Sequence, residues 1–510
     1  MRALISVYDK TGLDEFARGL DELGFELVAS GGTAGFLEEQ GLQVTHVEAV
    51  TQAPELLGGR LKTLHPRIHG GILARRDRAD DLEALDEQEI EPFDLVCVNF
   101  YPFSSIVHRH GARMEDAVEM IDIGGPSMLR AAAKNFAHVA PVSGREQYAA
   151  VLDELRKNGA LSSETRHALA AAAFARTAAY EAAIARWFAE GEGLPETLSL
   201  AFEKVQDLAY GENPHQRAAY YREVDARRPL LSNIEQLHGR DLSFNNLHDL
   251  AGALMLLREF ALPVCVIVKH ANACGVAVAA TIDEAYERAL ASDPLSAFGM
   301  VCAVNRPVGA GLAARLAEQF VDVLFAPDYE PDALAAWKAK PDTRILADRE
   351  RRAFPAEELD YKRVPGGLLV QRRDWDVDER DTMNVVAGSL SEEQWGDLLF
   401  AWRVCKHIWS NAIVIAKNLQ TIGIGAGQQS RVDAVRIALE KARKFDHDLE
   451  GAVLASDAFF PFADGPEQAL ARGVRAIIQP GGSKRDAEVV EAVERAGAAM
   501  VFTGRRHFRH

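Results

Sequence analysis

ALISVY (residues 3–8) is a short apolar run, and LDEFARGLDELG (13–24) follows it with the spacing of an amphipathic helix. FELVAS (25–30) then returns to the character of a buried strand. Two further runs of this kind follow: FDLVCVNF (93–100) and HVAPVS (138–143). Strands that alternate with helices predict a parallel sheet with helices on both faces over about the first 190 residues.

A chain of 510 residues has room for two to four domains of ordinary size. An alanine-rich helical stretch over residues 168–188 is followed by GEGLPETLS (191–199), where glycine, proline and polar residues interrupt the helical pattern. We therefore place a domain boundary there, which gives domains of residues 1–195 and 196–510.

The second domain also alternates strand-like and helical segments. Its predicted strands are VCVIVKH (264–270), MVCAV (300–304), AIVIAKN (412–418), AVLAS (452–456), RAIIQ (475–479) and AAMVF (498–502). SDPLSAFG (292–299) and SDAFFPFA (456–463) echo each other, each following or ending a strand, and this favours two similar subdomains. The charged segment around 340–380 is expected to decorate the surface between them.

The composition excludes several classes of protein. A net charge of −18 disfavours binding to nucleic acid or to anionic membranes, because both need a basic face. The five cysteines are scattered without a C-x-x-C pair, which is typical of a reducing compartment. We see no secretory signal and no apolar run of about 20 residues, so we expect a cytoplasmic protein.

Two glycine-rich turns in the first domain could hold an anion. Ser30-Gly31-Gly32-Thr33 joins a strand to a helix, and Tyr8-Asp9-Lys10-Thr11-Gly12 does the same after the first strand. Backbone N–H groups at a helix start bind phosphate well, although each turn alone is equally compatible with an ordinary capped helix. The chain has neither a Walker A sequence nor G-x-G-x-x-G, which disfavours an NTPase or a dinucleotide enzyme.

GGRLKTLHPRIHGGIL (58–73) is a basic, glycine-flanked stretch. It is either a solvated surface loop or, more in keeping with an acidic protein, an anion-recognition loop. His65 and His69 have the spacing of a helical metal pair, but Pro66 should break the helix that such a pair needs. We therefore predict no zinc there.

Other segments carry groups suited to proton transfer. Asp122, Tyr101, Lys62 and Lys134 would supply an acid, a phenol and two amines, although separately Asp122 could be an N-cap and Lys134 a solvated residue. In the second domain, Lys269-His270 ends an apolar strand, where a lysine is either partly desolvated or simply extends its charge to solvent. Cys274, among small neighbours, is interpreted as packing.

These motifs, in this order, resemble one enzyme family over essentially the whole chain. The matching blocks are SVYDKTGL, VASGGTA, GGRLKTLHP, NFYPF, IDIGGPSMLRAAAKN, YGENPHQ, VKHANACG, IGIGAGQQSR, SDAFFPF and the terminal HFRH. The family joins phosphoribosylaminoimidazolecarboxamide formyltransferase to inosine monophosphate (IMP) cyclohydrolase. The resemblance implies formylation of aminoimidazole carboxamide ribotide (AICAR) by 10-formyltetrahydrofolate, then ring closure to IMP, in a homodimer without a catalytic metal.

The resemblance also implies an α/β fold of two kinds: a doubly wound parallel sheet similar to methylglyoxal synthase, then a tandem of cytidine-deaminase-like subdomains without zinc. The cyclohydrolase catalytic residues would be Lys62, Tyr101, Asp122 and Lys134. Its substrate-binding residues would be Lys10, Thr11, Ser30, Gly31, Gly32, Thr33, Arg60, Thr63, Asn99, Gly124 and Gly125.

For the transferase, the resemblance implies His270 as the base and Lys269 as the group that stabilises the oxyanion. The residues implied for the ribotide are Tyr210, Asn246, Gly299, Asp322, Asn411 and Arg506. Those implied for 10-formyltetrahydrofolate are Arg431, Asp457, Gly481 and Gly482.

This chain departs from the family pattern at three positions. Ala209 stands where arginine is usual before Tyr210, which puts a phosphate contact in doubt, while Ala273 and Met300 should change only loop stiffness and packing. Two other classes of function remain open. A zinc nucleoside deaminase would need ligands that the sequence lacks, and a non-catalytic sensor of purine ribotides would need the residues around Lys62 and Asp122 to be idle.

Overall fold

The computed structural model describes residues 1–54, 57, 60–107, 113–189, 193–224, 231–349 and 358–510. Gly58 and Gly59 of the basic stretch, Gly191 and Glu192 of the predicted boundary, and residues 350–357 of the charged segment lie outside the described residues. The chain divides into two compact units. Unit 1 comprises Met1–Glu203 with Glu223–Asp225, and unit 2 comprises Lys204–Arg222 with Ala226–His510.

Unit 1 is built on a five-stranded sheet in which every pair is parallel. The order across the sheet is β3 (Thr45–His46), β2 (Glu26–Ala29), β1 (Arg2–Ser6), β4 (Leu95–Val98) and β5 (Ala140–Val142). The four predicted strands are confirmed with shorter bounds. The two-residue β3 was not predicted, because so short a strand leaves no periodic signal.

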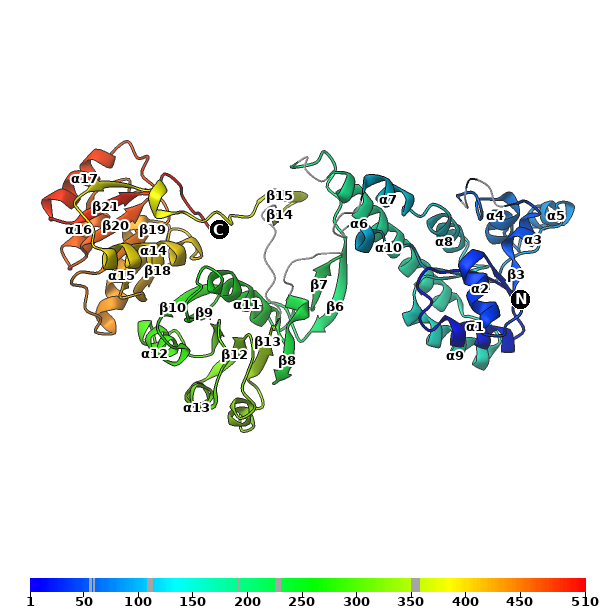
Figure 1. The fold of residues 1–510 in the computed structure, drawn as a ribbon, viewed down its shortest axis with the longest axis horizontal. Helices are drawn as coiled ribbons and strands as arrows, with labels where there is room; N and C mark the ends of the chain where they lie inside the picture. Colours follow the sequence, from blue (N-terminus) through cyan, green and yellow to red (C-terminus); the bar gives the residue numbers. More distant parts are fainter. Residues whose placement is uncertain (55–56, 58–59, 108–112, 190–192, 225–230, 350–357) are drawn as a thin grey trace. The chain divides into compact units, whose positions relative to one another are not determined.

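Helices cover both faces of this sheet (Figure 1). Ala3 and Ile5 of β1 join one core with Phe16 of α1, while Leu4 between them joins the other core with Leu129 of α8. This alternation is what a strand buried on both sides requires, so the doubly wound prediction is confirmed. The helices of unit 1 are α1 (Leu13–Glu22), α2 (Gly31–Glu39), α3 (Val47–Thr51), α4 (Pro66–Leu73), α5 (Ala79–Glu87), α6 (Phe103–Val107), α7 (Met114–Glu119), α8 (Gly124–Lys134), α9 (Tyr148–Asn158) and α10 (Ser163–Phe188).

The basic stretch 58–73 is only partly a loop. Pro66 is the first residue of α4, and His65 caps that helix by accepting a hydrogen bond from the N–H of Arg67 at 3.2 Å. Proline fits the first turn of a helix, where its missing N–H has no partner to lose. The prediction that Pro66 breaks a helix is therefore wrong, because it begins one.

Unit 2 contains a twelve-stranded sheet that is internally repeated. Its order is β16-β21-β20-β19-β17-β18, then β10-β9-β11-β12-β13-β8. From the centre outward, each half shows two antiparallel pairs, two parallel pairs and one antiparallel pair. The halves meet where β10 pairs with β18 at Ala277 and Gln420. The two similar subdomains are therefore confirmed.

The elements follow one another in the same order in both repeats, except that α17 of the second repeat stands where the first has a 3-10 helix, Ala333–Trp337. The first repeat contains β8 (Glu235–His238), α11 (Phe244–Leu257), β9 (Val264–Lys269), β10 (Asn272–Val278), α12 (Ile282–Ser292), β11 (Met300–Val304), α13 (Ala310–Glu318), β12 (Val321–Ala326) and β13 (Arg344–Ala347). The second contains β16 (Asn384–Ala387), α14 (Glu392–Lys406), β17 (Ile413–Lys417), β18 (Gln420–Gly425), α15 (Arg431–Lys444), β19 (Val453–Ser456), α16 (Asp464–Leu470), β20 (Ala476–Gln479), α17 (Asp486–Arg495) and β21 (Ala499–Phe502).

The sequence echo that suggested the repeat does not mark equivalent positions. Residues 292–299 lie between α12 and β11, whereas residues 456–463 lie between β19 and α16. The first segment thus follows a helix rather than a strand. The duplication is real, but it rests on strand pairing across the whole sheet and not on this local similarity.

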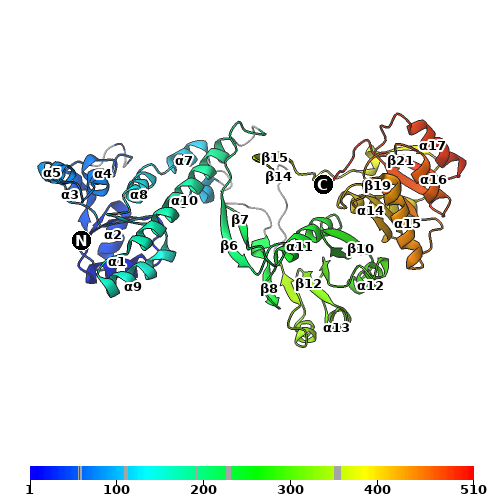
Figure 2. The same cartoon turned by 180° about the vertical axis from the view of Figure 1, so that it is seen from behind.

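The two faces of the large sheet are covered differently. On one face, α11 and α14 pack into a single core that spans both repeats and includes Leu250 and Leu398. On the other face, each repeat has its own core, one with α12 and α13 and one with α15, α16 and α17. Figure 2 shows the helices of the two repeats from behind.

One prediction about unit 2 needs correction. The charged segment 340–380 is not only surface, because its RILA stretch forms the buried strand β13, and its other described strands are the hairpin of β14 (Leu359–Val364) and β15 (Gly367–Arg372). The glycine-rich stretch from Ile422 begins within buried β18. A second small hairpin joins β6 (Phe202–Leu208) and β7 (Ala218–Glu223). Among the residues described, no helix is long and apolar enough to cross a membrane.

Candidate active sites

The predicted anion-binding turns of unit 1 lie at the carboxyl ends of the strands, and two polar side chains fasten them together. Thr33, in the first turn of α2, donates a hydrogen bond to the carbonyl of Val7 at 3.0 Å and accepts one from its N–H at 3.2 Å. Asn99, after β4, accepts from the N–H of Tyr8 at 2.6 Å and donates to the carbonyl of Asp9 at 2.8 Å. Both side chains therefore shape the turns that carry Lys10, Thr11, Ser30, Gly31 and Gly32.

Lys62 and Thr63 reach two helix N-termini at this edge of the sheet. A Cβ atom on Gly31 would lie 2.9 Å from Nζ of Lys62, and that ammonium is 3.2 Å from Oε1 of Glu48. A Cβ atom on Gly124 would lie 2.5 Å from Oγ1 of Thr63. Glycine is thus needed at both positions, because a side chain would displace the polar groups that converge there.

Asp122 lies at the start of α8 in a partly buried position. Its Oδ1 accepts a hydrogen bond from the N–H of Gly125 at 2.8 Å, and its own N–H donates to the hydroxyl of Tyr180 at 2.8 Å. Burial raises the pKa of this carboxyl, against backbone hydrogen bonds from Gly125 and Tyr101 that lower it. A carboxyl of raised pKa beside the Tyr101 backbone is the kind of group that exchanges protons in catalysis.

Two predicted members of this site lie elsewhere or are engaged elsewhere. Lys134 is the last residue of α8, ten residues after Gly124, so about 15 Å of helix separates it from the Asp122 end. It lines a cavity of about 610 Å³ with Phe136, His167 and Phe174, where α8 and α10 lie side by side (Figure 2). Arg60 is exposed and forms an ion pair with Glu119. Within one chain, the structure therefore does not bring Lys134 to Asp122.

In unit 2, Lys269 and His270 lie at the tight turn between β9 and β10. Lys269 pairs with Asn272, so the turn consists of His270 and Ala271, both with positive φ values of 53° and 59°. This two-residue turn with two left-handed residues suits the twist of a hairpin but is costly without glycine. Asp249 of α11 holds it by accepting a hydrogen bond from the N–H of Ala271 at 2.7 Å.

The second repeat has the same turn without the same chemistry. Asn418 and Leu419 take the places of His270 and Ala271, with φ values of 54° and 58°. Asp397 of α14 accepts hydrogen bonds from both of their N–H groups, at 2.8 and 2.6 Å. The carboxylate that holds the turn is therefore shared by the two repeats, whereas the imidazole is present only in the first.

Three further predicted residues gather beside Lys269. Its Nζ donates to the carbonyl of Gly299 at 2.7 Å, and Gly299 has a positive φ of 70°. Asn246, one turn before Asp249 on α11, donates to Oδ2 of Asp322 at 2.8 Å. Lys269, Gly299, Asn246 and Asp322 thus lie on adjacent elements of the first repeat.

Asn411, Arg431 and Asp457 form a buried network in the second repeat. Arg431 donates to the amide oxygen of Asn411 at 2.7 Å and forms an ion pair with Asp457, which also accepts from the hydroxyl of Ser410. Asp457 is 0% exposed. Its carboxylate is paired with Arg431, and the contact between Asp457 and the folate stays a prediction.

The other predicted transferase residues are accessible. Gly481 and Gly482 follow β20 with φ values of 73° and 96°, which only glycine adopts without strain. Tyr210 is 38% exposed, and the exposed Arg506 lies over the ring of Phe508 at 4.6 Å. The hairpin β9–β10 meets the loop before Asn411, where the N–H of Trp409 donates to Asn272 at 3.0 Å.

Sequence reasoning missed Glu48 and Tyr180, which contact Lys62 and Asp122. It also missed Asp249, which accepts a hydrogen bond from the N–H of Ala271, the residue after His270. Asp249 had a detectable signal. Ser243 and Asn246 form a capping box and precede Asp249 at three-residue intervals, and Ser391, Gln394 and Asp397 repeat this spacing. Comparing the two halves of the chain would have revealed it.

The geometry defines a protein of two compact α/β units, the first of them a doubly wound domain with two glycine-containing turns at its strand ends. The MGS-like domain model matches residues 12–127, and the model of the AICARFT/IMPCHase bienzyme family matches residues 132–441. The chain belongs to the AICARFT/IMPCHase bienzyme family. It is a bifunctional enzyme of purine biosynthesis, with AICAR formyltransferase and IMP cyclohydrolase activities.

Relatives of this chain match it from end to end. The bifunctional purine biosynthesis protein PurH of Persephonella marina is 48% identical over 514 residues, covering 100% of this chain and 99% of its own. The proteins of the same name from Magnetococcus marinus and Acidithiobacillus ferrooxidans are each 49% identical, with the same coverage. A solved structure titled "Crystal structure of ForH" covers 37% of this chain and 98% of its own, at 40% identity and a TM-score of 0.34.

Proposed function

We propose that unit 1 carries the cyclohydrolase and unit 2 the transferase. In unit 1, the turns after β1 and β2 would bind the phosphate of the formylated ribotide, together with Lys62 and Thr63. The carboxamide nitrogen attacks the formyl carbon, forming the ring bond, and the formyl oxygen leaves as water. Asp122 and Tyr101 would move the protons, since Asp122 has a raised pKa and lies beside the Tyr101 backbone.

Lys62, rather than Lys134, is the amine that we assign to this site. Lys62 abuts Gly31 at the start of α2, and its neighbour Thr63 abuts Gly124 at the start of α8. Lys134 lies at the far end of α8, beyond the reach of a substrate bound at the strand ends. The ammonium of Lys62 would stabilise negative charge that develops on the formyl oxygen during attack.

In unit 2, the imidazole of His270 would accept a proton from the 5-amino group of AICAR as that nitrogen attacks the formyl group of 10-formyltetrahydrofolate. The ammonium of Lys269 would stabilise the resulting oxyanion. Only one of its three N–H groups is needed for the carbonyl of Gly299, so others can point to the reacting oxygen. Collapse of the intermediate transfers the formyl group and releases tetrahydrofolate.

Binding of the two transferase substrates is assigned to the groups around this turn. Asn246, Gly299 and Asp322 would orient the ribotide from the first repeat, and Tyr210, Asn411 and Arg506 would contact it elsewhere. Gly481 and Gly482 would hold the folate. Arg431 would position Asn411 by its hydrogen bond, in addition to the folate contact that the family resemblance implies.

We also propose a fold for the subdomains of unit 2, a cellular compartment and an oligomeric state. The repeated halves of unit 2 support a tandem of cytidine-deaminase-like subdomains that work without a catalytic metal. We further propose that the enzyme is cytoplasmic and acts as a homodimer on small-molecule substrates.

Two observations support this assignment of the activities to the units. Asp122 of unit 1 has a carboxyl with a raised pKa, and in unit 2 the β9–β10 turn carries the imidazole of His270. The test is an absorbance assay for IMP with two inputs: AICAR plus 10-formyltetrahydrofolate, or formylated AICAR alone. Asp122→Asn should block IMP formation from both inputs. His270→Ala should block it only from the first, with a loss of about 10²- to 10⁴-fold. The opposite pattern would reverse the assignment.

A further inference from the structure

The last six residues of the chain are fixed against the second repeat of unit 2. The N–H of His507 donates to the carbonyl of Asp457 at 3.1 Å, and the carbonyl of Arg509 accepts from the N–H of Ser410 at 2.8 Å. These backbone contacts place the C-terminal segment (residues 505–510) between the Asp457 loop and the Ser410–Asn411 loop. Both loops belong to the buried network that includes Arg431.

Side chains from Arg506 to His510 alternate between solvent and the protein, as in an extended strand. His507 is 2% exposed, whereas Arg506 and Phe508 on either side of it are exposed. The guanidinium of Arg506 lies over the ring of Phe508. Whatever anchors His507 therefore also fixes the direction in which Arg506 points.

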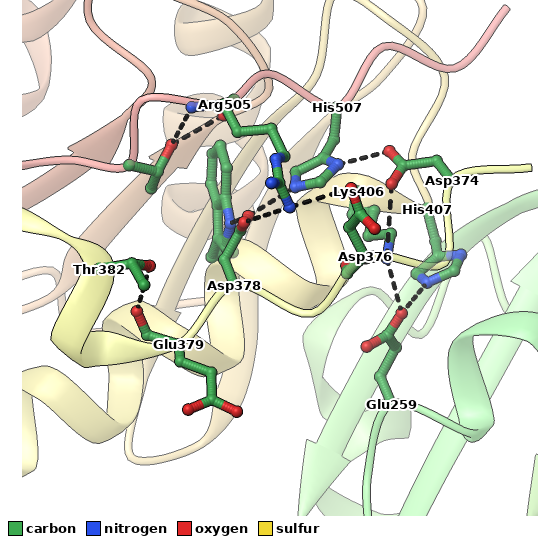
Figure 3. Close-up of polar contacts among 12 residues, drawn as sticks. Glu259, Asp374, Asp376, Asp378, Glu379, Thr382, Lys406, His407, Arg505 and His507 are labelled. Carbon is green, nitrogen blue, oxygen red and sulfur yellow. Dashed lines mark hydrogen bonds and ion pairs between the residues drawn. The ribbon is translucent and has the colours of Figure 1, made fainter. Parts of the chain in front are cut away.

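His507 is anchored by two carboxylates, one on each ring nitrogen (Figure 3). Its Nδ1 lies 2.5 Å from Asp374 and its Nε2 lies 2.6 Å from Asp378. Trp402 packs edge-on against the ring at 5.3 Å and donates its indole N–H to Asp378. Two carboxylate partners require both ring nitrogens to donate, so the side chain is the imidazolium. We call Asp374, His507 and Asp378 the His507 clasp.

Burial alone would lower the pKa of His507, but the hydrogen bonds and charges of Asp374 and Asp378 outweigh it and raise the pKa to about 9. The same contacts lower the pKa of both carboxyls, against their burial. The clasp is therefore charged throughout the neutral range.

Other charged groups connect the clasp to both repeats (Figure 3). Lys406, at the end of α14, lies 3.9 Å from Asp374 and 3.4 Å from Glu259, which follows α11. Arg505 contacts Asp376 at 3.0 Å and Asp378 at 3.4 Å. His407 pairs with Glu259 at 2.8 Å, and its carbonyl accepts from Arg509 at 2.6 Å. The cluster thus joins the first repeat, the second repeat and the C-terminal segment.

We propose that the His507 clasp holds the C-terminal segment in the transferase site, which makes His507 a positioning residue for ribotide binding through Arg506. This inference rests on the proposed role of Arg506 as a phosphate contact. It adds the element that fixes this arginine in an extended, otherwise exposed segment. Because Ala209 replaces a phosphate-binding arginine in the family pattern, binding in this enzyme should depend strongly on that fixation.

The test is steady-state kinetics of the full-length His507→Gln variant. Glutamine fills similar space but is uncharged and carries both N–H groups on one nitrogen, so it cannot replace the contacts of both ring nitrogens, and the segment should lose its fixed position. We expect the transferase KM for AICAR to rise about 10-fold with kcat changed less than about twofold, because loss of uniform binding raises KM alone. Cyclohydrolase turnover on formylated AICAR should stay unchanged. His447→Gln, at a half-buried histidine bonded to the Ala291 carbonyl at 3.0 Å, is the matched control and should leave both activities unchanged.

The pH dependence of KM separates positioning from a merely structural role. In the wild type, KM should rise as the pH passes about 9, where His507 loses its proton. In Asp374→Asn, which removes one of the carboxylates that raise this pKa, the rise should come at a lower pH. Lys406 and Arg505 face the clasp as well, and both residues are unchanged in this variant. Asp374→Asn also serves if His507→Gln does not fold.

Each outcome decides the inference. If the KM for AICAR is normal in His507→Gln but raised in Arg506→Ala, the positioning role of the His507 clasp is wrong, while the role of Arg506 in ribotide binding stands. A normal KM in both variants would remove Arg506, and with it the proposed position of the ribotide phosphate. A lower melting temperature with unchanged KM would show that the clasp only stabilises the fold.

Discussion

Replacing Asp249 by alanine should lower the transferase rate, whereas the same change at Asp397, which holds the equivalent turn of the second repeat, should mainly lower stability. Asp249 accepts the N–H of Ala271 at 2.7 Å and so holds a turn in which His270 and Ala271 both have positive φ. Asp397 does the same in the second repeat, but there the turn carries Asn418 and Leu419. The chain thus supplies its own control.

The magnitude follows from these contacts. A hydrogen bond to a charged group contributes about 1.5–3 kcal/mol, and each non-glycine residue in the left-handed region costs at least about 1 kcal/mol. Without the carboxylate, the bond no longer offsets the strain, and the turn should relax. A displacement of His270 by about 1 Å would lower the transferase rate by roughly 10²-fold. Asp249→Asn keeps an acceptor oxygen and should lose much less.

Asp397→Ala loses two hydrogen bonds instead of one, so it should destabilise unit 2 at least as much as Asp249→Ala does. Its transferase kcat should nevertheless change only a few-fold, because the residue displaced is Asn418. The assays are transferase kcat at saturating substrates and urea unfolding of each variant. Equal losses of kcat in Asp249→Ala and Asp397→Ala would refute the reasoning, since stability alone would then explain both.

Three other predictions follow from the same geometry. A fragment of residues 1–195 should convert formylated AICAR to IMP without folate, and a folded but inert fragment would contradict the placement of the cyclohydrolase. Asp122→Asn should stabilise unit 1 at neutral pH, because a raised pKa means that ionised Asp122 costs stability. The gain in melting temperature should grow as the pH rises from the ordinary aspartate pKa to the raised one, and it should vanish below the ordinary pKa. Ala209→Arg should lower the transferase KM for AICAR by up to about 10-fold by restoring a charged phosphate contact, and a higher KM would show that the pocket lacks room for it.

Much of the fold could be predicted from local sequence. The apolar runs that form β1 and β9 are buried on both faces of a sheet, and their continuous apolar composition predicts this burial. The doubly wound sheet followed from such runs, whereas the two similar halves of unit 2 were inferred from a short echo that does not mark equivalent positions. Helix starts were less reliable, as Pro66 shows, because the same residue that ends one helix can begin another.

The candidate sites were predictable where motifs are contiguous. The Ser30–Thr33 turn, Asp122 with Gly125, and Lys269 with His270 each lie within a few residues of one another, so local spacing was enough. Long-range partners gave no such signal. The hydroxyl of Tyr180 accepts a hydrogen bond from the N–H of Asp122, which lies 58 residues away in the chain.

The sequence by itself determined that the strongly apolar runs are strands, which family the chain resembles and which residue types can perform acid–base chemistry. Only the tertiary structure decided which of them meet. It placed Lys134 at the far end of the helix that Asp122 begins, buried the carboxylate of Asp457 under Arg431, and fixed the C-terminal segment through His507. The physical reason is that burial and charge pairing depend on contacts between segments far apart in the chain, whereas periodicity and capping depend only on near neighbours.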